Sequence, residues 1–167
     1  MTQLPDNEQL FEATFSGQLG VGLGMIALCV FIHGMGLFTL QRIMHAKAIE
    51  ERLDKCEALS FSGALFTLMT VFALIFVHLT EIWLFAFLYD YLGALPDFEE
   101  SLYFSTISYS TIGYSDTSIV EDWRMIAALE GILGVIMLGW STAFFVRILG
   151  RLEGELYDPA PRATSED

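Results

Sequence analysis

The chain has 167 residues, 54% of them hydrophobic and 14% aromatic, and its 21 Asp and Glu outnumber its 8 Lys and Arg. This apolar content is too high for an ordinary globular domain and indicates helices that cross a lipid bilayer. The formal net charge of −13 argues against nucleic acid as a partner, because there is no basic surface to neutralise phosphates. No motif indicates a small-molecule substrate or a cofactor, and we expect membrane lipid to surround the chain.

Three segments are long and apolar enough to span the hydrocarbon core, which requires about 20 residues. They cover residues 19–41, 62–90 and 123–150. Residues 1–18 contain no Lys or Arg, so they lack the basic start of a secretory signal peptide and are expected to form an N-terminal segment outside the membrane. We therefore predict an all-α membrane protein.

The positions of Lys and Arg predict how these spans are oriented. Apart from Arg124, the basic residues lie in the loop 42–61 or near and beyond the end of the third span. Because cytoplasmic loops are enriched in such residues, we expect this loop and the tail 151–167 to be cytoplasmic and the N-terminus to be outside. The composition of the loop predicts a short solvated helix within it.

Between the second and third spans lies an apolar stretch that is too short to cross a membrane. Asp97 and Glu100 form a D-x-x-E capping box, which predicts a helix over residues 98–110 that enters and leaves on the same side. The carbonyl end of such a helix carries partial negative charge, which favours a cation at membrane depth.

The string T-I-G-Y-S-D follows this helix at residues 111–116. Non-helical backbone inside a membrane is tolerated only where protein buries it or where it lines a watery path. Successive carbonyl groups from Thr111 onward, with the Thr111 hydroxyl, can replace the hydration shell of a monovalent cation. One chain cannot enclose an ion in this way, so this chemistry requires several copies around an axis.

The string T-I-G-Y-S-D after the helix Y-F-S-T-I-S-Y-S, followed by a spanning helix, resembles the pore module of potassium channels, whose filter usually reads T-V/I-G-Y-G-D. The resemblance covers roughly residues 64 to 149. It implies a pore domain over residues 62–150, with an outer helix, a re-entrant pore helix, a selectivity filter and an inner helix, assembled as a homotetramer. The whole chain is most similar to small bacterial ion-channel proteins with one additional N-terminal span, which places it in a bacterial plasma membrane.

The resemblance also implies where ions bind. Potassium, as the permeant ion, would be held at the carbonyl groups of a filter formed by Thr111, Ile112, Gly113, Tyr114, Ser115 and Asp116. We expect the side chain of Ile112 to face away from the ion, into the surrounding packing.

The third predicted span carries two glycines, Gly134 and Gly139, that match the inner-helix glycines of the family. Gly134 is then the candidate gating hinge, because a missing side chain permits a bend. The alternative is that these glycines only allow close packing of helices. A stripe at helical spacing is expected to line the inner cavity: Val135, Leu138, Thr142 and Val146.

Ser115 departs from the family pattern, which has a second glycine with positive φ at this position. A non-glycine residue in that conformation costs about 1–2 kcal/mol. Two outcomes stay open: either Ser115 finds a local partner such as Asp116 and potassium selectivity is kept, or the outermost site is deformed and selectivity is weak. The resemblance further implies that Tyr103 braces Asp116, while Phe104 is placed to pack on Tyr114.

Several ionisable residues lie within the predicted spans, where charge is costly. His78 and Glu81 share a helix face, and Glu130 is expected at a similar depth and turned away from the cavity. A buried cluster of these three residues would serve either interhelical hydrogen bonding or the sensing of protons or divalent ions. His33 is expected deeper toward the cytoplasm, as a packing contact.

These features predict a passive cation channel that prefers potassium, and not an enzyme. The alternatives are a weakly selective monovalent cation channel and a non-conducting regulatory membrane subunit with the same fold. An intramembrane metallohydrolase is disfavoured, because the pair His78 and Glu81 does not belong to an H-E-x-x-H motif.

Overall fold

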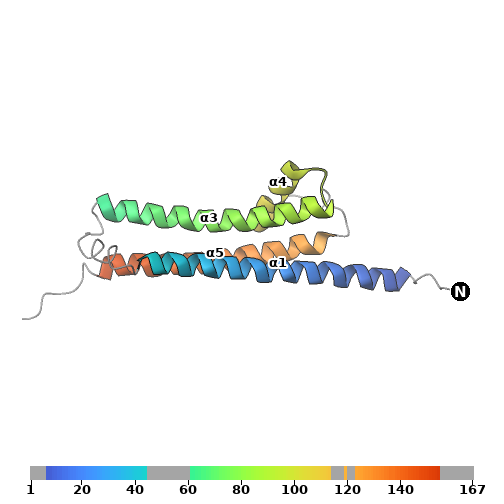
Figure 1. The fold of residues 1–167 in the computed structure, drawn as a ribbon, viewed down its shortest axis with the longest axis horizontal. Coiled ribbons are helices and arrows are strands. Elements are labelled where there is room, and N and C mark those ends of the chain that lie inside the picture. Colours follow the sequence, from blue (N-terminus) through green and yellow to red (C-terminus); the bar gives the residue numbers. More distant parts are fainter. Residues whose placement is uncertain (1–6, 45–60, 114–118, 120–122, 155–167) are drawn as a thin grey trace, which may run out of the picture.

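The computed structural model describes residues 7–44, 61–113, 119 and 123–154, and in these ranges every regular element is a helix (Figure 1). The helices are α1 (Asn7–Met44), α3 (Phe61–Leu92), α4 (Phe98–Tyr109) and α5 (Arg124–Gly154). The all-α class predicted from the sequence is confirmed. The expected helix in the cytoplasmic loop and the residues Tyr114, Ser115 and Asp116 lie outside the described residues.

Three of the helices are long and apolar enough to cross a membrane. The apolar spans run over Phe15–Met44, Gly63–Leu92 and Arg124–Gly150. They agree with the three predicted segments to within a few residues: the first two are longer than predicted, and the third is one residue shorter. The added length lies chiefly in α1, which is one continuous helix from Asn7.

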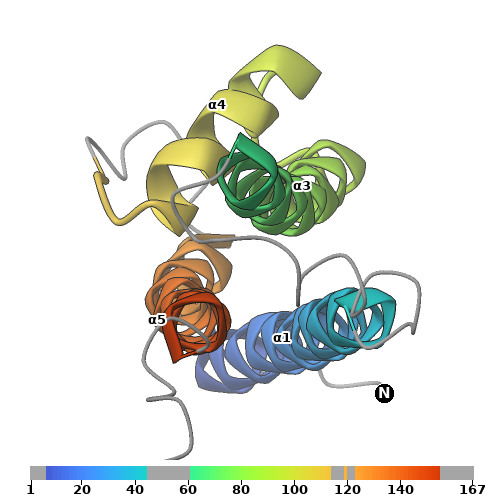
Figure 2. The ribbon, with the colours of Figure 1, turned by 90° about the vertical axis from the view of Figure 1, so that its left-hand side faces the viewer.

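The long helices lie alongside one another, and α4 sits at one end of them (Figure 1). The start of α1, the end of α3 and the start of α5 are at this same end. Viewed along the helices, α4 packs on α3 and α5, on the opposite side from α1 (Figure 2). The short helix therefore packs on two spans, and α5 begins at the end of the molecule where α3 ends, which is the arrangement expected of a re-entrant helix.

Local sequence explains where α3 ends and α4 begins. Gly93 follows α3 with a φ of 61°, and the N–H of Ala94 donates to the carbonyl of Tyr89 at 2.9 Å, a glycine-capped helix end. Four residues later, the side chain of Asp97 accepts a hydrogen bond from the N–H of Glu100 at 2.9 Å. This confirms Asp97 as the N-cap, which fixes the first turn of α4.

A buried apolar cluster draws its members from all four helices and from the residues that flank α4. Its members are Cys29, Ile82, Phe85, Tyr89, Ala94, Leu95, Phe104, Tyr109, Ile119, Ile126, Leu133 and Met137. Many other large apolar side chains are exposed on the outer faces of the helices. In a membrane protein such faces contact lipid or other copies of the chain.

Candidate functional site

The C-terminal end of α4 lies directly against α5. A Cβ atom added to Gly134 would lie only 2.0 Å from the carbonyl oxygen of Tyr109, and one added to Gly131 would lie 3.4 Å from the carbonyl oxygen of Ser108. Gly134 therefore permits close packing of the two backbones, the alternative that the sequence left open. α5 is one helix through this position, and a hinge at Gly134 stays a prediction.

The backbone after α4 closes the helix end. Thr111 has a φ of 61°, its N–H donates to the carbonyl of Ser108 at 3.0 Å, and the N–H of Ile112 donates to that of Ile107 at 2.9 Å. Gly113, with a φ of 48°, also donates to Ile107. This is a helix cap of the Schellman type, in which the amides bond to the nearest unpaired acceptors of α4. The cap engages the N–H groups of these residues, and the prediction that their carbonyl groups bind an ion stays a prediction.

Residues 111–113 are all exposed in the single chain. The side chain of Ile112 is 59% exposed in one copy of the chain, so the packing expected around it would have to come from other copies and stays a prediction. The exposed Thr-Ile-Gly segment begins directly after the C-cap of α4, a helix with one buried face. Its binding of K⁺ stays a prediction.

The predicted cavity stripe of α5 lies on the exposed face of that helix. Val135 and Val146 are 57% and 60% exposed, and Leu138 is 44% exposed; Gly139 and Thr142 are also exposed. The opposite face of α5 is buried and carries Leu133, Met137, Ser141 and Ile148. The stripe is therefore available to face an axis shared with other copies.

The two residues expected to support the filter differ in burial. Phe104 is 5% exposed, and its ring meets that of Tyr89 edge-on at a centroid distance of 5.5 Å. Tyr103 is 56% exposed. Phe104 thus packs toward α3, while the expected contacts with Tyr114 and Asp116 involve residues outside the described ranges.

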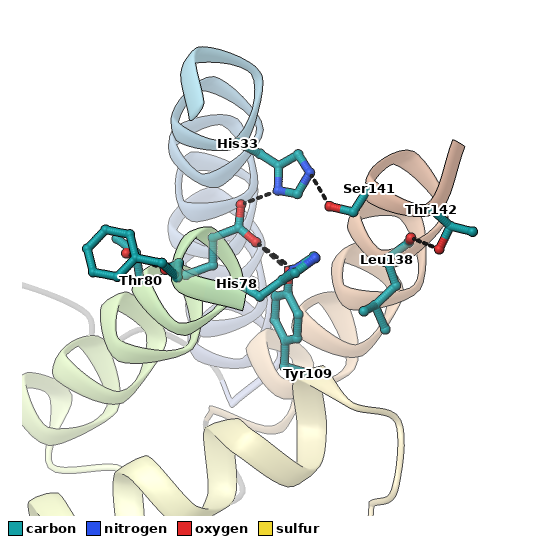
Figure 3. Close-up of polar contacts among 9 residues, drawn as sticks. His33, His78, Thr80, Tyr109, Leu138, Ser141 and Thr142 are labelled. Carbon is teal, nitrogen blue, oxygen red and sulfur yellow. Dashed lines mark hydrogen bonds and ion pairs between the residues drawn. The ribbon is translucent and has the colours of Figure 1, made fainter. Parts of the chain in front are cut away.

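Four side chains from three helices form a largely buried polar group, which we call the histidine cluster: His33, His78, Glu81 and Tyr109. Figure 3 shows His33, His78 and Tyr109 pointing toward one another. Nδ1 of His33 lies 3.0 Å from Oε1 of Glu81. Nδ1 of His78 lies 2.9 Å from the Tyr109 hydroxyl, which donates to Oε2 of Glu81. His33 and Glu81 are fully buried, and the cluster joins α1, α3 and the last residue of α4.

Ser141 extends the histidine cluster to α5, since its hydroxyl lies 3.2 Å from Nε2 of His33 (Figure 3). One arrangement of protons satisfies every contact at once. In it Ser141 donates to His33, His33 donates to Glu81, His78 donates to Tyr109 and Tyr109 donates to Glu81. A complete network of this kind satisfies the buried carboxylate without a charged partner.

A second buried group, the Glu130 cluster, consists of Glu130, Tyr89 and Ser105. The Tyr89 hydroxyl donates to Oε2 of Glu130 at 2.7 Å. The Ser105 hydroxyl lies within hydrogen-bond distance of both Oε1 of Glu130 and the carbonyl oxygen of Ile82. Because Ser105 has a single hydroxyl proton, both bonds are satisfied when the carboxyl group of Glu130 is protonated and donates to it.

The structure corrects the predicted polar cluster in two ways. Glu130 has partners of its own and does not join His78 and Glu81, because its side chain points to α3 and α4 through Tyr89 and Ser105. His33 is not a mere packing contact, because α1 brings it to the same depth as Glu81.

Sequence reasoning missed the partners that α4 supplies to these clusters. Ser101, Ser105 and Tyr109 are all buried and recur every four residues, so they form one polar face of α4. This spacing is a signal that was available in the sequence. No comparable spacing in the sequence indicated that Ser141 would join the histidine cluster.

Comparison with known families agrees with this arrangement. Residues 74–151, which include most of α3, all of α4 and most of α5, match the profile of a family described as an ion channel. This confirms the resemblance to the pore-domain family that the sequence indicated. The searches of curated proteins and of solved structures gave no match.

Proposed function

We propose that this chain, whose residues 74–151 belong to an ion-channel family, assembles as a homotetramer and conducts cations passively through the membrane, with potassium preferred. The family match supports an ion channel. The number of copies in the assembly, the preferred ion and the residues of the filter go beyond that match.

The observation that carries the proposal is the placement of Thr111, Ile112 and Gly113. They follow a 12-residue helix whose start is capped by Asp97 and whose end packs against Gly134. A short helix held between two spans aims its carbonyl end at one point, where partial negative charge favours a cation. Residues placed there supply backbone oxygens to an ion.

The exposed surfaces support assembly around an axis. The pore module exposes residues 111–113 after α4. It also exposes the stripe of α5 that runs from Val135 to Val146. Four copies arranged around an axis would bring together four such segments, which is what a dehydrated K⁺ requires because one segment cannot surround it.

Acidic side chains at one end of the molecule support cation conduction. Asp90 at the end of α3, with Asp97, Glu99 and Glu100 around the start of α4, are all exposed. Repeated in several copies, this charge would concentrate cations at the mouth and repel anions, with an effect that weakens as ionic strength rises. The bias of Lys and Arg predicts that this end faces away from the cytoplasm.

Flux into liposomes tests the proposal with a matched pair of variants. Gly113 and Gly93 both have positive φ, of 48° and 61°, and neither has an atom within 4 Å of an added Cβ. Alanine therefore costs about 1–2 kcal/mol of backbone strain at either position. We expect Gly113→Ala to abolish potassium flux and Gly93→Ala to keep it.

Three outcomes are informative. Equal flux in both variants would refute the role of Gly113, and absence of flux in the wild-type protein would favour a non-conducting subunit. A mass of the solubilised protein that corresponds to one or two copies, where we expect four, would refute the tetramer.

A further inference from the structure

We infer that His33, His78 and Glu81 form a binding site for one divalent transition-metal ion of the Zn²⁺ type, buried between α1 and α3. Each residue offers one donor atom, and the three atoms lie within 4.8 Å of one another. This inference concerns a site away from the filter and does not depend on ion conduction.

The spacing of the donor atoms suits a small metal ion. Bonds of about 2.0–2.1 Å in a tetrahedral site place neighbouring ligands roughly 3.3–3.4 Å apart. Nδ1 of His33 lies 3.0 Å from Oε1 of Glu81, and Nδ1 of His78 lies 3.7 Å from Oε2. These separations lie on either side of the required value and end on the two oxygens of Glu81, so the side chains must rotate to bring all three ligands onto one ion.

A neighbouring group orients the first ligand. Ser141 lies 3.2 Å from Nε2 of His33, the ring nitrogen that does not face Glu81. Histidines that bind metals commonly hydrogen-bond through the other ring nitrogen, which fixes the ring and its tautomer. With Nε2–H donating to Ser141, Nδ1 of His33 presents a lone pair toward Glu81 and the metal.

The chemistry of the donors selects the kind of metal. Two imidazole nitrogens and one carboxylate favour zinc, cobalt, nickel or iron over magnesium and calcium, which prefer oxygen ligands. The Tyr109 hydroxyl, which contacts both His78 and Glu81, stands beside the remaining coordination position. Binding at Nδ1 requires each neutral imidazole to carry its proton on Nε2, so the proton moves between the two ring nitrogens and none is released.

Charge also favours a cation here. The carboxylate of Glu81 is fully buried, and its hydrogen-bond partners are the imidazole of His33 and the hydroxyl of Tyr109. The hydrogen bonds satisfy the oxygens of this carboxylate but leave its charge uncompensated, which is costly inside a membrane. A divalent ion supplies that charge and joins α1 to α3 beside the last residue of α4.

Cobalt binding tests the site without any measurement of flux. Tag-free protein in detergent, freed of metal by a chelator, is titrated with Co²⁺ and followed by its visible absorption and by elemental analysis. We expect one Co²⁺ per chain, displaced by Zn²⁺, and an affinity at least tenfold lower in Glu81→Gln. Ser141→Ala, which keeps all three ligands, is expected to weaken binding about tenfold.

Glu130→Gln is the matched control, because it alters a buried carboxyl group that belongs to the other cluster, and it should leave cobalt binding unchanged. A wild-type Kd weaker than about 1 mM would show that the cluster is only a hydrogen-bond network and would overturn the inference. Undiminished binding in both Glu81→Gln and Ser141→Ala would overturn it as well. If Glu81→Gln does not fold, Ser141→Ala and the elemental analysis still decide.

Discussion

Substitution of Gly134 by alanine perturbs a close contact between α5 and the last residue of α4. The added Cβ would lie 2.0 Å from the carbonyl oxygen of Tyr109 and 2.9 Å from its carbonyl carbon. A carbon and an oxygen in ordinary contact are separated by about 3.3 Å, so the two backbones must move apart by roughly 1.3 Å. No rotation of a side chain relieves this overlap, because both groups belong to the main chain.

The expected cost follows from two opposing effects. Overpacking of a close contact costs about 1–3 kcal/mol, and a backbone obstacle belongs at the upper end of this range. Alanine recovers about 1 kcal/mol through its higher helix propensity. We therefore expect Gly134→Ala to lower the free energy of unfolding by about 1–2 kcal/mol per chain.

Gly139→Ala provides the control on the same helix, because an added Cβ there has no atom within 4 Å. This variant should be stabilised by about 0.5–1 kcal/mol. In thermal melts of the detergent-solubilised protein, the Tm values of the two variants should differ by several degrees. Potassium flux should fall in Gly134→Ala, because Thr111 lies two residues beyond Tyr109.

The reasoning is refuted if Gly134→Ala melts at or above the temperature of Gly139→Ala. A variant that keeps its Tm and its ion selectivity but opens less often would instead identify Gly134 as a hinge.

Two further predictions concern the supports of α4. Asp97→Ala removes the N-cap and should lower stability by about 1 kcal/mol, whereas Glu99→Ala, an exposed change in the same turn, should stay within about 0.5 kcal/mol; equal melting temperatures would contradict the role of Asp97. Glu130→Gln should be tolerated, because an amide both donates to Ser105 and accepts from Tyr89, while Glu130→Leu leaves Tyr89 without its acceptor and should cost about 1–3 kcal/mol. If Glu130→Gln is as unstable as Glu130→Leu, the carboxyl group of Glu130 is not protonated in the wild-type protein.

Much of the fold follows from local features of the sequence. The three spans follow from long apolar runs, because a bilayer selects for length and hydrophobicity. The start of α4 follows from Asp97, because a cap acts on the helix turn next to it. These predictions needed no knowledge of how the helices are arranged.

The partners of the buried polar groups could not be predicted in the same way. α1 and α3 are apolar on most sides, so their sequences do not fix which face turns toward the protein. His33 and Glu81 lie 48 residues apart, and their contact depends on the rotation and depth of both helices. For the same reason, Gly134 was recognisable as a glycine of interest, but not as the position that receives the carbonyl of Tyr109.

The measurement that tests the central claim most directly is the reversal potential of purified protein in a planar bilayer, with potassium on one side and sodium on the other. We predict a reversal potential close to that of a potassium-selective pore in the wild-type protein, and no loss of selectivity in Ser115→Gly. Equal permeability of the two ions in the wild type, with discrimination restored by Ser115→Gly, would contradict the claim that the T-I-G-Y-S-D filter prefers potassium.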